Sequence, residues 1–155
     1  MDLIIARAVH VLAVVAWIGG VGFVTMAAFP AIRRGYPGRE RLGAFVAFES
    51  GFAPQARVWV ALAGLSGLHM AWRLDLWPRF AMPRFWWMHA MVGLWAVFAL
   101  MLFVLEPLVL HRRMDAAIGA PEGERLFDRM ERLHRLLWFF ALVTVAGAVA
   151  GSHGF

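Results

Sequence analysis

Four long apolar stretches, separated by short charged connections, make up most of the chain. They run from about Leu3 to Phe29, from about Phe52 to Trp77, from about Phe85 to Leu110 and from about Leu133 to Ala150. A helix that crosses a hydrocarbon core of roughly 30 Å needs about 20 mainly apolar residues. The pattern therefore predicts a single transmembrane domain over residues 1–155, all-α and folded as an integral membrane four-helix bundle.

The arginines indicate on which side of the membrane each connection lies. The first connection (31–49) and the third (111–132) are rich in arginine, whereas Asp75 offsets the two arginines of the second (74–84). Connections rich in Arg and Lys stay in the cytoplasm. We therefore expect both termini in the periplasm, in a multi-pass protein of the bacterial inner membrane. The charged segment 122–132 is expected to extend the fourth helix or to lie at the membrane interface.

Composition narrows the chemistry further. Hydrophobic residues make up 62% of the chain and charged residues 16%, whereas soluble domains are about half apolar and about a quarter charged. The chain has no cysteine, which excludes disulfides, thiolate metal sites and cysteine nucleophiles. The net charge of +5 comes from arginines grouped between the spans, so we interpret it as a topology signal and expect no nucleic-acid binding.

Three histidines are the strongest candidates for a functional site. His10, His69 and His89 lie in the first, second and third spans, each in the half nearer the periplasm. Ionisable groups within membrane spans are costly and are functional candidates by default. A single histidine would be explained by a hydrogen bond between helices. Three at similar depth favour a shared ligand site.

A haem between helices is the ligand that the surrounding residues favour. It needs two facing histidines, aromatic packing and cations for its propionates. Trp17 lies two turns from His10 on the same helix face, while Arg7 and Arg73 lie on the periplasmic side of His10 and His69. These two arginines either pair with propionates or snorkel to the lipid headgroups. We expect haem b, with iron ligands drawn from His10, His69 and His89.

Copper is the alternative metal, because it binds histidines together with methionine thioethers. Four methionines lie on the same side of the predicted bundle, namely Met70, Met82, Met88 and Met91. Methionines in so apolar a chain mostly fill the core, so copper ranks below haem.

A second group of ionisable residues is expected on the cytoplasmic side. His111 ends the third span, His134 begins the fourth and Glu106 lies about one turn inside. The presence of His134 is explained by a solvated position at the membrane interface. The functional alternative is that it belongs to a second haem site or to a proton path. Glu49 is interpreted as a cap or anchor of the second helix.

Two motifs resemble a known membrane family. Phe85-Trp-Trp-Met-His89-Ala90 and Arg7-Ala-Val-His10, followed by Trp17, resemble segments of the HemJ-type protoporphyrinogen oxidases. Trp17-Ile-Gly-Gly20 after a histidine is similar to the broader CopD-like membrane proteins. The four-helix layout and the length also match.

This resemblance implies a b-type haem with His10 and His89 as axial ligands, and an oxidative step on a porphyrinogen. The chain departs from the family where Met91 stands in place of a lysine after His-Ala, and where Arg7 replaces the lysine of the first helix. If that lysine is needed, the chain does not oxidise porphyrinogens. His69 is an addition, and it either replaces one of the two ligands or binds a second group.

The leading hypothesis is a haem b membrane protein that moves electrons, for example from quinol to an acceptor at the periplasmic face. The alternatives are a HemJ-like protoporphyrinogen IX oxidase and a CopD-like copper transport or binding protein. The expected partners are the lipid bilayer and either a quinone or a porphyrinogen. The number of haems stays open, as does assembly into a homo-oligomer.

Overall fold

The structure is a computed structural model that describes residues 1–153, except for the side chains of residues 110 and 111. Helices account for nearly all of the described residues, and no strand occurs among them. The side chain of His111, which the sequence had indicated as a candidate, therefore lies outside the described part.

The first apolar stretch forms one continuous helical run made of α1 (Asp2–Phe23), η1 (Val24–Ala28) and α2 (Phe29–Gly35). The run continues past Pro30 because the preceding turn widens into the π-helix η1. A proline ring clashes with the carbonyl four residues earlier in a regular α-helix, and a π-turn relieves this clash. The remaining elements follow in this order: η2 (Gly38–Glu40), α3 (Arg41–Arg73), α4 (Trp77–Phe80), η3 (Pro83–Phe85), α5 (Trp86–Leu100), η4 (Met101–Leu110), α6 (His111–Ala117) and α7 (Pro121–Ser152).

Within the described residues 1–153, three helical runs are long and apolar enough to cross a membrane, namely Asp2–Gly35, Pro83–Val109 and Pro121–Ser152. Their outer faces carry exposed apolar side chains such as Leu12 and Phe139. This part of the prediction is confirmed, and the chain is a membrane protein by the length and composition of these helices. The helix α3 falls below this level because Arg57 and Arg73 lie near the ends of its apolar part.

Besides the first helix, which continues to Gly35 instead of ending near Phe29, two helices differ from their expected boundaries. The second helix begins at Arg41 instead of near Phe52, and it ends at Arg73 instead of near Trp77. Its first turns carry charge, yet Leu42 and Phe45 are almost completely buried there. The fourth helix begins at Pro121, so residues 122–132 extend it, which is one of the two placements expected for them.

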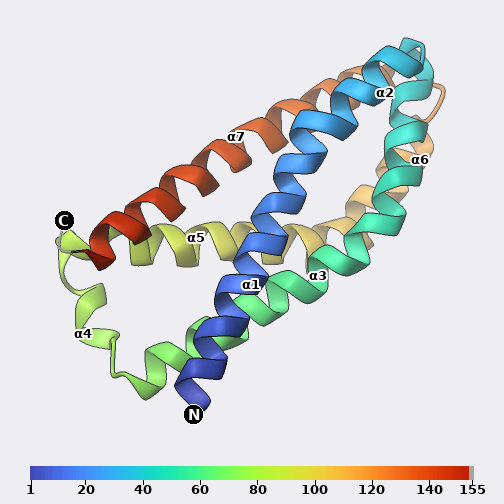
Figure 1. Cartoon of the computed structure of the whole chain (residues 1–155). Helices are drawn as coiled ribbons and strands as arrows, with labels where there is room; N and C mark the ends of the chain where they lie inside the picture. The colour runs from blue at the N-terminus through green and yellow to red at the C-terminus, as the bar shows by residue number, and fades with distance from the viewer. Residues whose placement is uncertain (154–155) are drawn as a thin grey trace.

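The four long helical segments form two antiparallel pairs. Asp2 contacts Arg73, and His10 contacts Ala63, so α1 and α3 run in opposite directions. In the second pair, the rings of Trp86 and Trp87 lie against glycines of α7. In Figure 1 the start of α1 and the end of α7 lie well apart, and the connection containing α4 runs between them.

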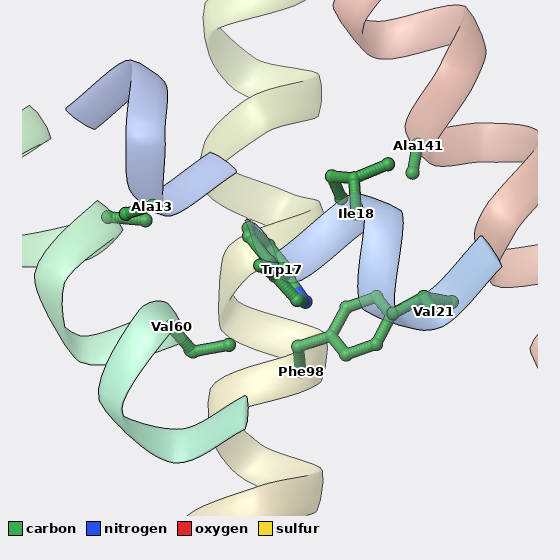
Figure 2. Close-up of a cluster of buried hydrophobic side chains, with 8 residues drawn as sticks. Ala13, Trp17, Ile18, Val21, Val60, Phe98 and Ala141 are labelled. Atoms are coloured by element: carbon green, nitrogen blue, oxygen red, sulfur yellow. The ribbon is translucent and has the colours of Figure 1, made fainter. Parts of the chain in front are cut away.

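Two apolar clusters join the pairs. The first is built from α1, α3, α5 and α7 and is drawn in Figure 2: Ala13, Trp17, Ile18, Val21, Val60, Ala63, Phe98 and Ala141. The second lies where α2, α3, α6 and α7 meet: Val24, Phe29, Ile32, Leu42, Phe45, Met114, Phe127 and Met130. Beside this cluster, the buried carboxylate of Glu131 accepts hydrogen bonds from the guanidinium groups of Arg33 and Arg135. The bond from Arg33 links α2 to α7.

Candidate functional site

His10 is held by α3. Its Nδ1 lies 2.9 Å from the carbonyl oxygen of Ala63 and 3.2 Å from the hydroxyl oxygen of Ser66. Gly67 leaves room for the ring, because a methyl group there would approach the ring to 3.1 Å. A carbonyl oxygen only accepts, so Nδ1 carries the proton and donates it to Ala63. The other nitrogen, Nε2, is then the one with a free lone pair.

His69 and Arg73 share a carboxylate with the start of α1. Oδ2 of Asp2 accepts a hydrogen bond of 2.9 Å from Nε of Arg73 and lies 3.6 Å from Nε2 of His69. Arg73, for which a haem propionate and the lipid headgroups were the two expected partners, pairs with Asp2 in this structure. Arg7 is exposed. His69 also lines an open cleft with Trp72 and Trp77.

His89 lies on the other helix pair. Its side chain is exposed on α5, and its ring meets the ring of Phe80 edge-on at 5.3 Å between centroids. Among residues 1–153, leaving out the side chains of 110 and 111, no three His, Cys, Asp or Glu side chains are grouped to hold a metal ion. His10, His69 and His89 are thus at matched depth in the sequence but are not gathered around one point here.

The arrangement of His10 therefore suits a haem ligand, but the residues around it do not form a complete haem site. A ligating histidine usually donates its second ring nitrogen to a carbonyl or carboxylate, which fixes its tautomer, and His10 has this arrangement with Ala63. A clamp by His10 and His89 would need the free ends of the two helix pairs to close around the porphyrin. The donor set suits haem iron, and the two-sided clamp is not formed in this structure.

Trp17, which the sequence places two turns from His10, lies in the core. It is 5% exposed, and its ring meets Phe98 edge-on at 5.0 Å. Figure 2 shows the indole between Val60 of α3 and Phe98 of α5. Its Nε1–H has no hydrogen-bond partner in the described part of the chain, although a buried indole N–H usually finds one.

Trp17 borders a cavity that sequence reasoning missed. We call it the central cavity and define it by Trp17, Glu49, Phe52, Phe98 and His134, which are among its lining residues. It encloses about 60 Å³ between α1, α3, α5 and α7. Glu49 reaches this cavity because α3 already begins at Arg41. The signal in the sequence that could have revealed the cavity is a row of lining residues spaced three or four apart along α3: Phe45, Phe48, Phe52, Ala56 and Trp59.

His134 lies in this cavity instead of at a solvated boundary. Its Nδ1 is 2.9 Å from the carbonyl oxygen of Met130, one turn earlier in α7, so Nε2 is left as an acceptor. The rings of Phe29 and Phe45 meet it edge-on, at 5.1 and 6.0 Å between centroids. Aromatic packing thus fixes the ring, and the hydrogen bond fixes its tautomer.

A charged pair lies next to the cavity. Arg57 of α3 donates from Nη2 to Oε1 of Glu106 at 2.8 Å, and from Nε to the carbonyl oxygen of Leu102 at 3.0 Å. Glu106 lies in the π-helix η4, just before Pro107. Glu49 is within electrostatic range of both members of the pair. This pair joins α3 to the third apolar run.

Comparison with protein-family models, with curated proteins and with solved structures finds no match to this chain.

Proposed function

We propose that the chain is a four-helix integral membrane protein of the bacterial inner membrane, with both termini in the periplasm, that binds haem b and moves electrons. The fourth span in this proposal is α3. The two arginines near the ends of its apolar part are each neutralised, Arg57 by Glu106 and Arg73 by Asp2. Paired charges near the ends of a span are far cheaper in lipid than unpaired ones, which supports insertion of α3.

Single cysteines test this topology, because the natural chain contains none. Ala81→Cys and Ala116→Cys both place a thiol at an exposed position. With four spans, we expect a membrane-impermeant maleimide to label position 81 in intact spheroplasts, and to label position 116 only after permeabilisation. If α3 does not cross the membrane, positions 81 and 116 exchange sides. Labelling of 116 but not of 81 in intact spheroplasts therefore contradicts the proposal.

One observation carries the haem assignment, namely the hydrogen bond from Nδ1 of His10 to the carbonyl oxygen of Ala63. It holds the ring in the tautomer that offers Nε2 to a metal. Imidazole is a common axial ligand of haem iron. Ser66 at 3.2 Å from the same nitrogen, and Gly67 against the ring, restrict the ring further.

The second axial ligand in this proposal is His89, with His69 as its competitor. His89 is exposed and not hydrogen-bonded within the described part of the chain, so its ring is available as a ligand. His69 already lies near Asp2, and Arg73 occupies the same carboxylate. A haem with two histidine ligands has no open position and supplies one-electron transfer.

The haem content of the purified protein tests this proposal. We expect a coloured protein with the reduced bands of a b-type haem. A colourless protein that retains copper supports the copper alternative instead, and a colourless protein without metal contradicts both.

A further inference from the structure

We propose that the central cavity binds the head group of a quinol dissolved in the membrane. A quinol would supply the electrons for the proposed electron-transfer function, and the present proposal rests on that function. The site is nevertheless distinct from the histidines near the periplasm. It lies about seven residues, or two turns, further along α1 from His10, at Trp17.

The polar groups around the cavity select the ligand. Nε1–H of the almost completely buried Trp17 is a donor without a partner among the described residues. Nε2 of His134 is an acceptor, because Nδ1 donates to Met130. Glu49 lines the same space and makes no hydrogen bond within the described part of the chain. One donor and two acceptors suit a ring that carries two hydroxyl groups, in which one oxygen accepts from Trp17 while the two O–H groups donate.

The walls of the cavity suit a planar ring, and its size requires a lining side chain to move. Aromatic side chains of Trp17, Phe45, Phe52 and Phe98 line it, and binding sites for small ligands are usually apolar with a few convergent polar groups. Its volume of about 60 Å³ holds several waters, at roughly 10–15 Å³ for each. A ring must displace these waters and push the half-buried Phe52 aside.

The route to the cavity favours a lipid-soluble ligand over a polar one. The cavity lies between helices whose outer faces are apolar, with exposed side chains such as Val15 on α1 and Phe140 on α7. A ligand that arrives through the bilayer must therefore be apolar outside its head group. Quinols combine an apolar tail with a dihydroxy ring and meet both requirements.

Duroquinol, the tetramethyl quinol without a tail, is the probe that tests this assignment. Its binding to the purified full chain in detergent is measured by anaerobic titration calorimetry. Trp17→Phe removes the N–H and keeps a ring, and Glu49→Gln keeps the size and removes the charge. We expect each substitution to weaken binding about tenfold, since a hydrogen bond contributes roughly 0.5–1.5 kcal/mol, or more when one group is charged, and 1.4 kcal/mol corresponds to a factor of ten.

Matched controls at exposed positions are Trp72→Phe and Glu122→Gln, and we expect wild-type affinity for both. Equal affinity in all five proteins means that duroquinol binds elsewhere, and absence of binding to the wild type means that the cavity holds water only. Either result overturns the assignment. The haem content of the same samples separates the two proposals. Binding by a haem-free protein contradicts only the haem, and a haem-loaded protein that does not bind contradicts only the quinol site.

Discussion

Replacing His10 by alanine is expected to lower the ratio of haem to protein at least tenfold, because the substitution removes the imidazole that offers Nε2 to the iron. Losing only a hydrogen-bonding partner of a metal ligand already costs roughly 10–100-fold in metal affinity or activity, so losing the ligand costs more. The ratio is measured from the absorbance of the pyridine haemochrome. Free imidazole added to the alanine variant should restore part of the haem spectrum, since it fits the space left by the side chain.

His10→Asn separates a ligand from a simple link between helices. The side-chain amide of asparagine can still donate to the carbonyl oxygen of Ala63, which His10 contacts at 2.9 Å, but it is a poor ligand for haem iron. We expect this variant to keep most of its thermal stability and to lose its haem. If the variant keeps both its haem and its stability, His10 is not a haem ligand and only forms a hydrogen bond between helices.

The other histidines identify the second ligand in the same assay. His89→Ala is expected to lose the low-spin spectrum of a haem with two histidine ligands, whereas His69→Ala should keep it. His153→Ala is the control, because this histidine ends α7 and its Nδ1 lies 2.8 Å from the carbonyl oxygen of Val149. An unchanged spectrum in the His10, His69 and His89 variants alike contradicts a haem site in this half of the protein.

Breaking the pair of Arg57 and Glu106 is expected to give the largest loss of stability. Arg57→Met keeps an unbranched side chain of similar length but leaves the Glu106 carboxylate, 15% exposed, without the guanidinium 2.8 Å away. Removing one partner of a buried pair costs roughly 3–5 kcal/mol. We expect about 2–3 kcal/mol here, because the Arg57 side chain is 33% exposed. Thermal unfolding followed by circular dichroism in detergent measures the loss.

A double substitution distinguishes this electrostatic loss from lost packing. Arg57→Met combined with Glu106→Gln also removes the charge that Arg57 neutralises at Glu106, so it should recover at least half of the lost stability. Arg34→Met is the control at an exposed position and should change stability little. If the double variant is no more stable than Arg57→Met alone, the loss comes from packing of the arginine side chain and not from the charge.

The length of the apolar stretches was enough to predict three of the long helical runs. It failed at the start of α3, where Arg41 and Glu49 made the segment resemble a connection. The burial of Leu42 and Phe45 shows why the helix begins earlier. Three positions apart, they lie on one face of the helix and pack into the second apolar cluster. Mean hydropathy over a segment does not detect a few apolar residues on one helix face when the rest of the segment is charged.

The sequence orders the candidate residues along the helices, but it does not give their direction around the helix axes. Trp17 and His10 were expected on one face of α1, and both do face α3, as their contacts with Val60 and Ala63 show. The sequence does not tell which helix covers that face, and in the structure Val60 and Phe98 belong to the same apolar cluster as Trp17. The central cavity could not be predicted for the same reason, because the sequence does not give the direction in which each side chain points around its helix axis.

The reduced-minus-oxidised absorption spectrum of the purified wild-type protein tests the central claim most directly. The account predicts sharp α and β bands of a low-spin b-type haem, in a stoichiometric ratio to protein. A colourless protein, purified from cells grown with ample iron and haem precursor, would contradict it.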